Sequence, residues 1–447
     1  MRYITKMSKT GIALTLSLVL GCLGVLTLPS LAFGASSRTL YVGHGTIGSG
    51  KSCDSPGYND VQDAVDAANK GDTVYLCGGQ FAEQVFVDKS ITLTGDKSSG
   101  LTAVGTTFTT STARYPSAFN TDGLFVPQAL LVITGSATAA TIDGLTISGP
   151  MPGNGSCGED EFGILALEGH VNLSGDKVLN IADSSNLLYG CQFGTGIQIG
   201  REYWPLPSFN DTIENFAATA SIDNVQVSGY QKNGITVDGA GSQADIMDSQ
   251  VTGNGRGVFG AIIAQNGIQI SRGAKASVIN NTVSENDYTG SGFASSGGIL
   301  VYGGGGDPLS VGVMVEGNHL VNNDVGIYLN NYNDNFSGAA STPTRDEAIN
   351  NVISDDAVTN ISGLCIAGEV YCGDQLIGYQ AGINDIGNKD VIVGNHISGP
   401  GYEPQGSYVY SPTASIFTKE GPDNVLIRPI DAGYSFPTID AMVYGND

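Results

Sequence analysis

Residues 266–286 read NGIQISRGAKASVINNTVSEN, and the spacing of apolar residues in this stretch decides the fold. Ile268 and Ile270 alternate with polar residues, which is typical of a short β-strand with one buried face. The second half has the order apolar, two residues, Asn, one residue, apolar, two residues, Asn, carried by Val278, Asn281, Val283 and Asn286. The stretch therefore predicts short strands separated by tight turns.

Both patterns recur along the chain. The first recurs as a Gly-Ile pair that begins at positions 163, 196, 234, 267, 298 and 326. The second begins at positions 142, 222, 246, 278, 315, 352 and 392. We expect the polar residues of the second pattern to form one column, in which stacked amides hydrogen-bond from repeat to repeat, with the members Ser249, Asn281, Asn318, Asp355 and Asn395.

The spacing of the second pattern predicts a coil. Successive copies lie 24 to 40 residues apart, apart from one step of 80 that covers two units. A coil of three short strands and three turns needs about 24 residues, and longer steps indicate loops inserted at turns. Each coil pairs only with its neighbours and the core grows in one dimension. We therefore predict one parallel β-helix instead of the roughly three domains that length alone suggests.

The segments before the repeats carry a resemblance to a known family. They read CDSPGY at 53–58, NDVQDAVDAANK at 59–70, GDTVYLC at 71–77 and GQFAEQVFV at 79–87. They resemble the opening of secreted pectin-lyase-like proteins, and the later units are similar to the generic repeats of that superfamily. The resemblance covers roughly residues 38–430. It implies an all-β fold, a right-handed parallel β-helix with an N-terminal capping α-helix.

The pattern at residues 59–70 predicts that cap helix independently. Val61, Val65 and Ala68 fall on one helical face, Asn59 stands where an N-cap is expected, and Gly71 is expected to end the helix. The apolar face would cover the open end of the coil, which otherwise exposes strand edges. We expect the β-helix domain to span residues 35–430 and residues 431–447 to form a C-terminal tail.

Composition and charge narrow the classes of function. Glycine makes up 64 of 447 residues, about 14% against a typical 7%. Asp and Glu number 43 against 19 Lys and Arg, which gives a net charge of −24. Nucleic-acid binding is excluded because phosphate contacts need clustered basic residues. A hydrophobic fraction of 41% is enough for a large core.

The N-terminus indicates secretion. Arg2, Lys6 and Lys9 precede an apolar run, and small residues at 32 and 34 offer a cleavage site, so residues 1–34 are predicted to be a signal peptide. An uncleaved membrane anchor and a lipid-modified Cys22 stay open as alternatives. After cleavage the chain would have a net charge of −27, because residues 1–34 hold three basic and no acidic residues. No later stretch is long and apolar enough to span a membrane, and we expect a monomer.

Six cysteines remain after the predicted signal peptide. An even number in a secreted chain indicates disulfides, and six cysteines allow 15 pairings. We expect sequential pairing, because each pair is local: Cys53 with Cys77, Cys157 with Cys191, and Cys365 with Cys372. No metal site is predicted, because the chain has no CxxC and its four His are scattered.

The catalytic motifs of this superfamily are incomplete here. Residues 120–123 read NTDG, as in polygalacturonases, but the expected Arg-x-Lys is absent. The later segments of pectin methylesterases and the Arg-x-Pro-x-x-Arg of lyases are also absent. No cofactor is predicted. A requirement for Ca²⁺ stays open, because a polyanionic substrate would need Ca²⁺ bridges to overcome repulsion by the negatively charged chain.

The outward positions of the Gly-Ile strands are the best candidate for a site. Because neighbouring coils are about 5 Å apart, polar and aromatic side chains there would form a strip suited to sugars. The predicted substrate-binding residues are Gln198, Arg201, Gln269, Tyr302, Tyr328, Asn330 and Tyr332. The candidates for acid or base are Asp238 and Arg272.

Two classes of function are compatible with these patterns. The first is a secreted protein that binds or processes a polysaccharide, as a lyase or glycosidase would, along one face of the solenoid. The second is a non-catalytic surface, adhesion or structural protein, which the missing catalytic motifs favour. A neutral glycan would meet no charge repulsion from this acidic chain.

Overall fold

The computed structural model describes residues 37–116, 126–153, 157, 160–203, 214–290, 294–335, 339–357, 359, 380–399, 425–426 and 442–446. Residues Ser37–Asp447 form one compact unit. Met1–Ser36, which include the predicted signal peptide, form a second unit and lie outside the described residues. In the part that the structure describes, no helix is long and apolar enough to cross a membrane.

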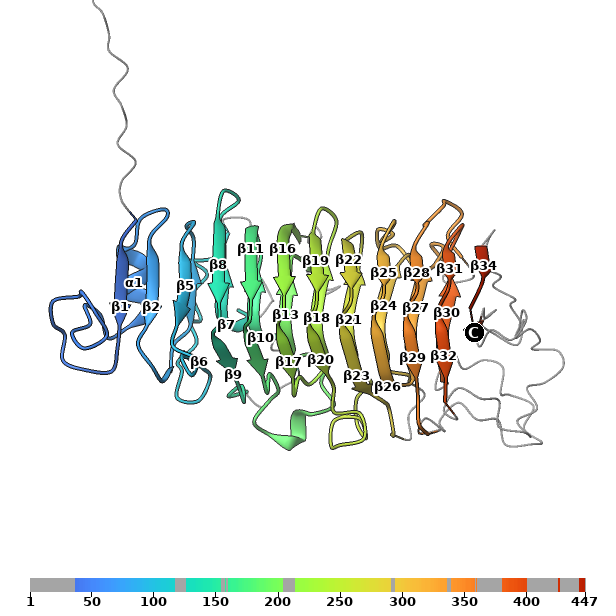
Figure 1. Cartoon of the computed structure of the whole chain (residues 1–447), viewed down its shortest axis with the longest axis horizontal. Helices are drawn as coiled ribbons and strands as arrows, with labels where there is room; N and C mark the ends of the chain where they lie inside the picture. The colour runs from blue at the N-terminus through green and yellow to red at the C-terminus, as the bar shows by residue number, and fades with distance from the viewer. Residues whose placement is uncertain are drawn as a thin grey trace, which may run out of the picture. The chain divides into compact units, whose positions relative to one another are not determined.

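Three parallel sheets run side by side along the coil, as the stacked arrows of Figure 1 show. The chain passes through them in turn, which confirms the predicted right-handed parallel β-helix; crossover connections between parallel strands are almost always right-handed. The long sheet contains β1 (Thr39–Val42), β2 (Thr73–Leu76), β5 (Thr92–Gly95), β8 (Ala139–Asp143), β11 (Gly169–Ser174), β16 (Ala218–Asp223), β19 (Gln243–Met247), β22 (Lys275–Ile279), β25 (Met314–Glu316), β28 (Glu347–Ile349), β31 (Val391–Val393) and β34 (Met442–Tyr444).

The other two sheets have ten strands each. The third sheet contains β3 (Gln80–Phe81), β6 (Gly100–Thr102), β9 (Thr146–Ser148), β12 (Lys177–Leu179), β17 (Gln226–Ser228), β20 (Gln250–Thr252), β23 (Thr282–Asn286), β26 (His319–Asn323), β29 (Val352–Ser354) and β32 (His396–Ser398). The Gly-Ile sheet contains β4 (Val85–Val87), β7 (Gln128–Ile133), β10 (Glu161–Ala166), β13 (Thr195–Ile199), β18 (Asn233–Asp238), β21 (Asn266–Ser271), β24 (Gly297–Gly303), β27 (Val325–Asn331), β30 (Ala381–Ile386) and β33 (Val425–Leu426).

The Gly-Ile motif fixes both the register and the spacing of its sheet. The isoleucines stand directly opposite one another and are all buried: Ile164, Ile197, Ile235, Ile268, Ile299, Ile327 and Ile383. The glycine before each is required by close approach, since a Cβ on Gly267 would lie 2.6 Å from the carbonyl oxygen of Gly298. This contact explains part of the glycine excess.

A column of amides holds the corner between the long and the third sheet. The amide oxygens of Asn318, Asn351 and Asn395 accept hydrogen bonds from the backbone N–H groups of Asn281, Asn318 and Asn351, at 2.9–3.0 Å. Ser249 belongs to this column as expected. The expectation for Asp355 is wrong, because Asn351 occupies the column in that coil and Asp355 follows β29 at another corner.

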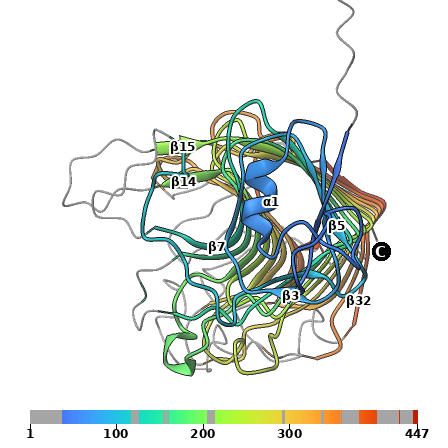
Figure 2. The same cartoon turned by 90° about the vertical axis from the view of Figure 1, so that its left-hand side faces the viewer.

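The cap helix α1 (Val61–Ala67) lies against the open end of the coil, which Figure 2 shows in a view along the axis. It buries Val61 and Val65 as predicted, but it is shorter than residues 59–70. Its N-cap is Asp60, whose side chain makes no capping bond. Instead the Glu83 carboxylate accepts hydrogen bonds from the N–H groups of Val61 and Gln62, at 2.9 and 3.0 Å. The helix is therefore capped by a side chain from the first coil.

Three shorter features complete the fold. The disulfides Cys53–Cys77 and Cys157–Cys191 are present as predicted, whereas the third predicted pair lies outside the described residues. The 3₁₀ helix η1 (Asn186–Leu188) and the antiparallel strands β14 (Arg201–Tyr203) and β15 (Glu214–Phe216) are inserted between coils. β34 pairs with β31, so the coil extends past the predicted boundary at residue 430.

Candidate functional site

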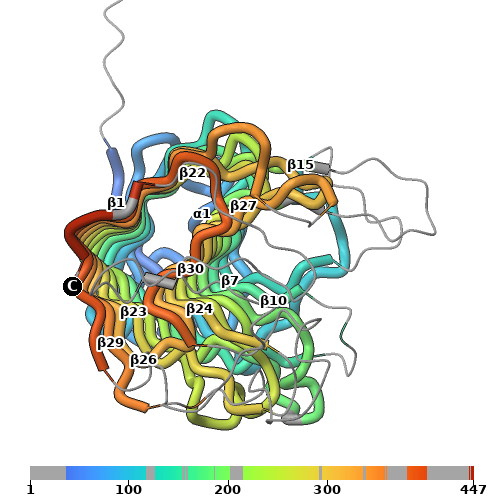
Figure 3. Tube along the Cα trace, turned by 90° about the vertical axis from the view of Figure 1, so that its right-hand side faces the viewer, coloured from blue at the N-terminus to red at the C-terminus, as the bar shows by residue number. Residues whose placement is uncertain are grey.

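The outer face of the Gly-Ile sheet changes character along the coil. In Figure 3, which looks along the axis from the C-terminal end, β7, β10, β24, β27 and β30 follow one wall. On the early strands of this wall, outward side chains form a buried apolar cluster, whose members are Phe86, Tyr115, Ala129, Val132, Phe162, Leu165, Leu167 and Phe216. From β18 onward most outward positions are polar, apart from a small apolar cluster of Val325, Tyr328, Ala381 and Leu300. The strip predicted to bind sugars lies on these later coils.

A continuous hydrogen-bond chain crosses the outer face of β18 and β21. The Asn266 amide donates to Asn233 and to Gln269, at 3.1 and 3.2 Å. Gln269 Nε2 donates to Ser271 Oγ at 3.0 Å, and Ser271 Oγ donates to Asp238 Oδ1 at 2.8 Å. These bonds hold each side chain in one orientation, so the face is organised in the absence of any ligand.

Asp238 and Arg272, the two predicted catalytic residues, are brought together and bind each other. Arg272 Nε and Nη2 donate to Asp238 Oδ1 and Oδ2, at 2.8 and 2.7 Å. Asp238 has no exposed surface, and the Arg272 side chain retains 26% of its surface. A carboxylate that is buried and doubly bonded to a guanidinium is poorly placed to exchange protons with a substrate. Its evident effect is to orient Arg272.

Tyr302 and Tyr332 lie beside this ion pair and are both part-exposed. Their ring centroids are 6.3 Å apart in an edge-to-face arrangement. Tyr302 stands opposite Ser271 in the register, and Asn330 stands opposite Tyr302. Two accessible aromatic rings next to amide and guanidinium donors are a combination that can contact both the faces and the hydroxyls of sugars.

Asp307 is a carboxyl group that sequence patterns did not indicate. It lies in the turn after β24 and is half-buried, and burial raises its pKa, with Arg272 opposing the shift and Asp238 adding to it. Burial also raises the pKa of Tyr302, and the charge of Asp307 raises it further. Asp307, Arg272 and Tyr302 therefore interact electrostatically. No strand pattern covers this turn, which is why Asp307 could not be found from periodicity.

The other predicted residues are less accessible. Gln198 is 2% exposed and donates to the carbonyl oxygen of Gly200 at 2.7 Å. Asn330 is 7% exposed and accepts from Asn384 Nδ2 at 2.8 Å. Tyr328 is 7% exposed, packs with Val325, Leu300 and Ala381, and lies over Gly297.

Arg201 lies where the early, apolar part of the outer face of the Gly-Ile sheet meets the later, polar part. It forms an ion pair with Asp160, and its guanidinium carbon lies 5.1 Å from the centroid of the Phe162 ring. It thus covers the apolar cluster of the early coils. The accessible part of the candidate site therefore reduces to Gln269, Arg272, Tyr302, Asp307 and Tyr332.

In the described ranges, no group of three or more His, Cys, Asp and Glu side chains is arranged so that it could hold a metal ion. Carboxylates do gather at the corner before β24 and β30, where Arg256 forms ion pairs with Asp287, Asp355 and Asp356. Asp287 and Asp355 are buried, so this cluster ties coils together.

Comparisons with known proteins find similar solved structures but no related sequence. No family model and no curated protein sequence matches the chain. The chain is similar to the crystal structure of pectate lyase Pel9A at 13% identity, covering 91% of this chain and 89% of that one with a TM-score of 0.41. It is similar to the Dettilon tailspike protein (gp208) at 15% identity and a TM-score of 0.41. The match covers 76% of this chain but only 58% of the tailspike.

A third similar structure is the alginate lyase from Paenibacillus sp. str. FPU-7, at 15% identity and a TM-score of 0.34, covering 72% of this chain and 94% of that one. At these identities the likeness is one of fold and extends to no activity. The three parallel sheets by themselves define this chain as a right-handed parallel β-helix protein.

Proposed function

We propose that this chain is a secreted protein that binds a neutral polysaccharide on the outer face of β21, β24 and β27. The observation that carries the proposal is the part-exposed pair Tyr302 and Tyr332, 6.3 Å apart, beside an Arg272 that Asp238 holds in place. Sugar rings stack on such aromatic faces, and fixed guanidinium and amide groups donate to hydroxyls. The net charge of −24 favours a neutral glycan over a polyanionic one.

If the glycan is also cleaved, Asp307 is the residue we assign as general acid. A half-buried carboxyl with a raised pKa retains its proton closer to neutral pH and can protonate a leaving oxygen. In this proposal Arg272 is a binding residue and Asp238 is the positioning residue that holds it, because the two form an ion pair in which Asp238 is buried. Hydrolysis would also need a second group within reach of the same sugar, a carboxylate that acts as nucleophile or as the base that activates water.

Non-catalytic binding is the second candidate, as expected for an adhesion or surface protein. The pairing of Asp238 with Arg272 favours it, since the two predicted acid–base residues neutralise each other. The two disulfides support an oxidising compartment, either extracellular or periplasmic, for both candidates. A monomeric state is a further part of the proposal.

A glycan panel tests the proposal directly. Binding of neutral and acidic polysaccharides is measured by calorimetry, and product is measured as new reducing ends and as unsaturated ends, each with Ca²⁺ and with a chelator. Tyr302→Ala is expected to weaken binding about tenfold, the loss of one aromatic contact of about 1.4 kcal/mol. Tyr75→Ala is the matched control, because it removes an outward tyrosine from the long sheet.

Asp307→Asn separates the two candidates. An enzyme would keep glycan binding and lose product, whereas a binding protein would release no product before or after the change. If neither binding nor product appears for any neutral or acidic glycan with Ca²⁺ present, the proposed function is wrong.

A further inference from the structure

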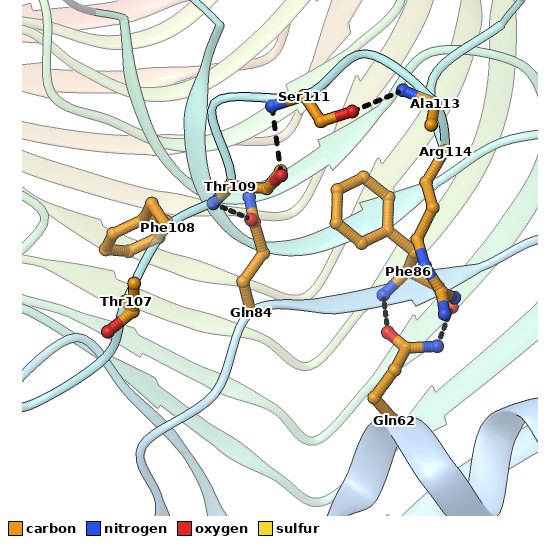
Figure 4. A pocket seen from close by; sticks show the side chains of 9 residues that line it. All are labelled: Gln62, Gln84, Phe86, Thr107, Phe108, Thr109, Ser111, Ala113 and Arg114. Carbon is orange, nitrogen blue, oxygen red and sulfur yellow. Dashed lines mark hydrogen bonds between the residues drawn. The ribbon is translucent and has the colours of Figure 1, made fainter.

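A separate pocket lies at the opposite end of the coil from the later strands. It is an open pocket lined by residues of α1 and β4, by Gln84 and by residues 107–114, and it has a volume of about 390 Å³. Figure 4 shows the side chains that line it, with Phe108 on one side and Phe86 on the other. The volume falls within the range of small-molecule sites, which is about 300–1,000 Å³.

Hydrogen bonds fix the long side chains of the pocket wall. Gln62 accepts from the Phe86 N–H at 2.7 Å and donates to the Phe86 carbonyl at 3.2 Å. Gln84 accepts from the Thr109 N–H at 2.9 Å and donates to the Ala129 carbonyl at 2.9 Å. Because both amides are already held, the pocket keeps its shape without a ligand, and binding costs little further ordering.

The charge at the pocket is balanced. Arg114 Nη1 and Nη2 donate to the two oxygens of the Asp66 carboxylate, at 2.9 and 2.7 Å. The same pairing with Arg114 lowers the pKa of Asp66, so the pair stays ionised and neutral overall at physiological pH. Arg114 is the one guanidinium among the described residues that line the pocket, and it is engaged with Asp66. An anionic ligand would therefore find it occupied and would also be repelled by the acidic chain.

The remaining lining combines rings with hydroxyl groups. Thr109 Oγ1 accepts from the Ser111 N–H at 3.0 Å, and Ser111 Oγ accepts from the Ala113 N–H at 3.3 Å. Each hydroxyl therefore has its own proton left to donate. Phe108 is part-exposed and supplies most of the apolar surface beside these hydroxyls, whereas Phe86 on the other side is 5% exposed. This lining suits a compact ring that carries hydroxyls at its edge and C–H groups on its faces.

We propose that this pocket binds one neutral sugar ring. The proposal does not depend on the function proposed for the later coils, because the pocket shares no residue with Tyr302, Tyr332 or Arg272. It would give the chain a second carbohydrate contact at the other end of the same sheet.

The test uses methyl glycosides of glucose, galactose and xylose as probes of the full chain. A ligand of about 12 heavy atoms in a small pocket is expected to have a Kd of about 1 mM, so saturation-transfer NMR and calorimetry up to about 50 mM are suitable. Phe108→Ala is expected to weaken binding at least tenfold. Ala113→Trp places an indole at the lining and removes no hydrogen bond of the pocket, so it blocks the site in a folded chain.

The outcomes are distinct. Binding that is lost in Ala113→Trp and retained in Tyr302→Ala supports the pocket, whatever the glycan panel shows for the later coils. The proposal is overturned if no glycoside binds at about 50 mM, or if Ala113→Trp and Phe108→Ala leave binding unchanged. Tighter binding of glucuronate than of the glucoside would also overturn it, because the charge argument would then be wrong.

Discussion

The early and the later coils of the Gly-Ile sheet share an inner face and differ on their outer face. Inside, one isoleucine column runs from Ile164 in β10 to Ile383 in β30. Outside, β10 presents Phe162 and Leu165 to a closed apolar cluster, whereas β21 presents Gln269 and the Asp238–Arg272 pair lies beside it. The difference shows that the coil needs only its inner columns, and that the outer face is free to take on binding chemistry.

The corner between the long and the third sheet repeats this contrast. In the later coils it is an unbroken run of amides that includes Asn281, Asn318 and Asn351. In an early coil the same corner holds Asp176, whose carboxylate accepts from the N–H groups of Leu145 and Ser174 at 2.8 and 3.1 Å. Amides satisfy buried backbone groups without carrying charge, so the later corner is the less sensitive to pH.

The largest expected loss of stability comes from a substitution on the outer face of the early coils. Phe162→Ala should reduce the free energy of unfolding by about 3–5 kcal/mol, because it leaves a cavity in a closed apolar cluster. Leu300→Ala, at a part-exposed outward position of β24, should cost about 1 kcal/mol. Denaturant unfolding followed by circular dichroism measures both. Equal losses would mean that the two parts of the outer face are packed alike.

Breaking the amide column of the later coils is expected to reduce the free energy of unfolding somewhat less. Asn318→Ala removes the acceptor of the Asn281 N–H and the donor to the Val278 carbonyl, both in the buried column. We expect a loss of about 2–4 kcal/mol, since each orphaned buried group costs about 1–3 kcal/mol. The exposed Asn335→Ala serves as control and should change stability by less than about 0.5 kcal/mol. A near-zero effect at Asn318 would contradict the structural role of the column.

Stability is expected to fall as pH rises from about 4 to about 7. Burial raises the pKa of Asp176 to about 7, of Asp287 to about 7 and of Asp355 to about 6. A raised folded pKa gives stability that is present below the unfolded pKa near 4 and is lost as pH rises through the folded value. The free energy of unfolding, measured at pH 4.5, 6 and 8, should therefore decrease in that order.

Single variants can separate the contribution of the early coils to this pH dependence from that of the later coils. Asp287→Asn keeps an oxygen for Arg256 and removes one of the two titrating groups of the later coils, leaving Asp355, so the slope between pH 5 and pH 7 should become shallower. The early contribution of Asp176 should persist in that variant. A slope that is identical to that of the unmodified chain would show that Asp287 does not titrate in this range.

The smallest expected effect on stability is at the candidate binding face. Tyr302 is part-exposed, so Tyr302→Ala should lower the free energy of unfolding by no more than about 1 kcal/mol. The same substitution is expected to weaken glycan binding about tenfold, which separates a binding role from a packing role. A stability loss as large as that of Phe162→Ala would show that Tyr302 is part of the packing.

Most of the fold could be predicted from local patterns. The Gly-Ile pairs and the Asn column repeat because every coil must bury the same inner positions and turn the same corner. The same residue pattern can therefore be recognised in each repeat. Asp355 was assigned to the wrong corner because an Asp at the right interval mimics the pattern that Asn351 completes. The cap helix was found, but its actual cap, Glu83, comes from a different element and has no local signal.

The candidate site could be predicted only in part. The outward column was located, and Gln269, Tyr302 and Tyr332 do remain accessible on it. Sequence patterns could not show that Tyr328 is covered or that Asp307 and Arg272 interact electrostatically, because both depend on turns whose conformation follows from neighbouring coils.

The sequence by itself determined that this chain winds into a parallel coil with a long apolar core, because alternation and repeat length are local properties of the strands. The tertiary structure decided which outward side chains are shielded, which pair with one another and which stay open to a ligand. Asp238 and Arg272 are 34 positions apart in the chain, and only the stacking of two coils makes them a closed ion pair.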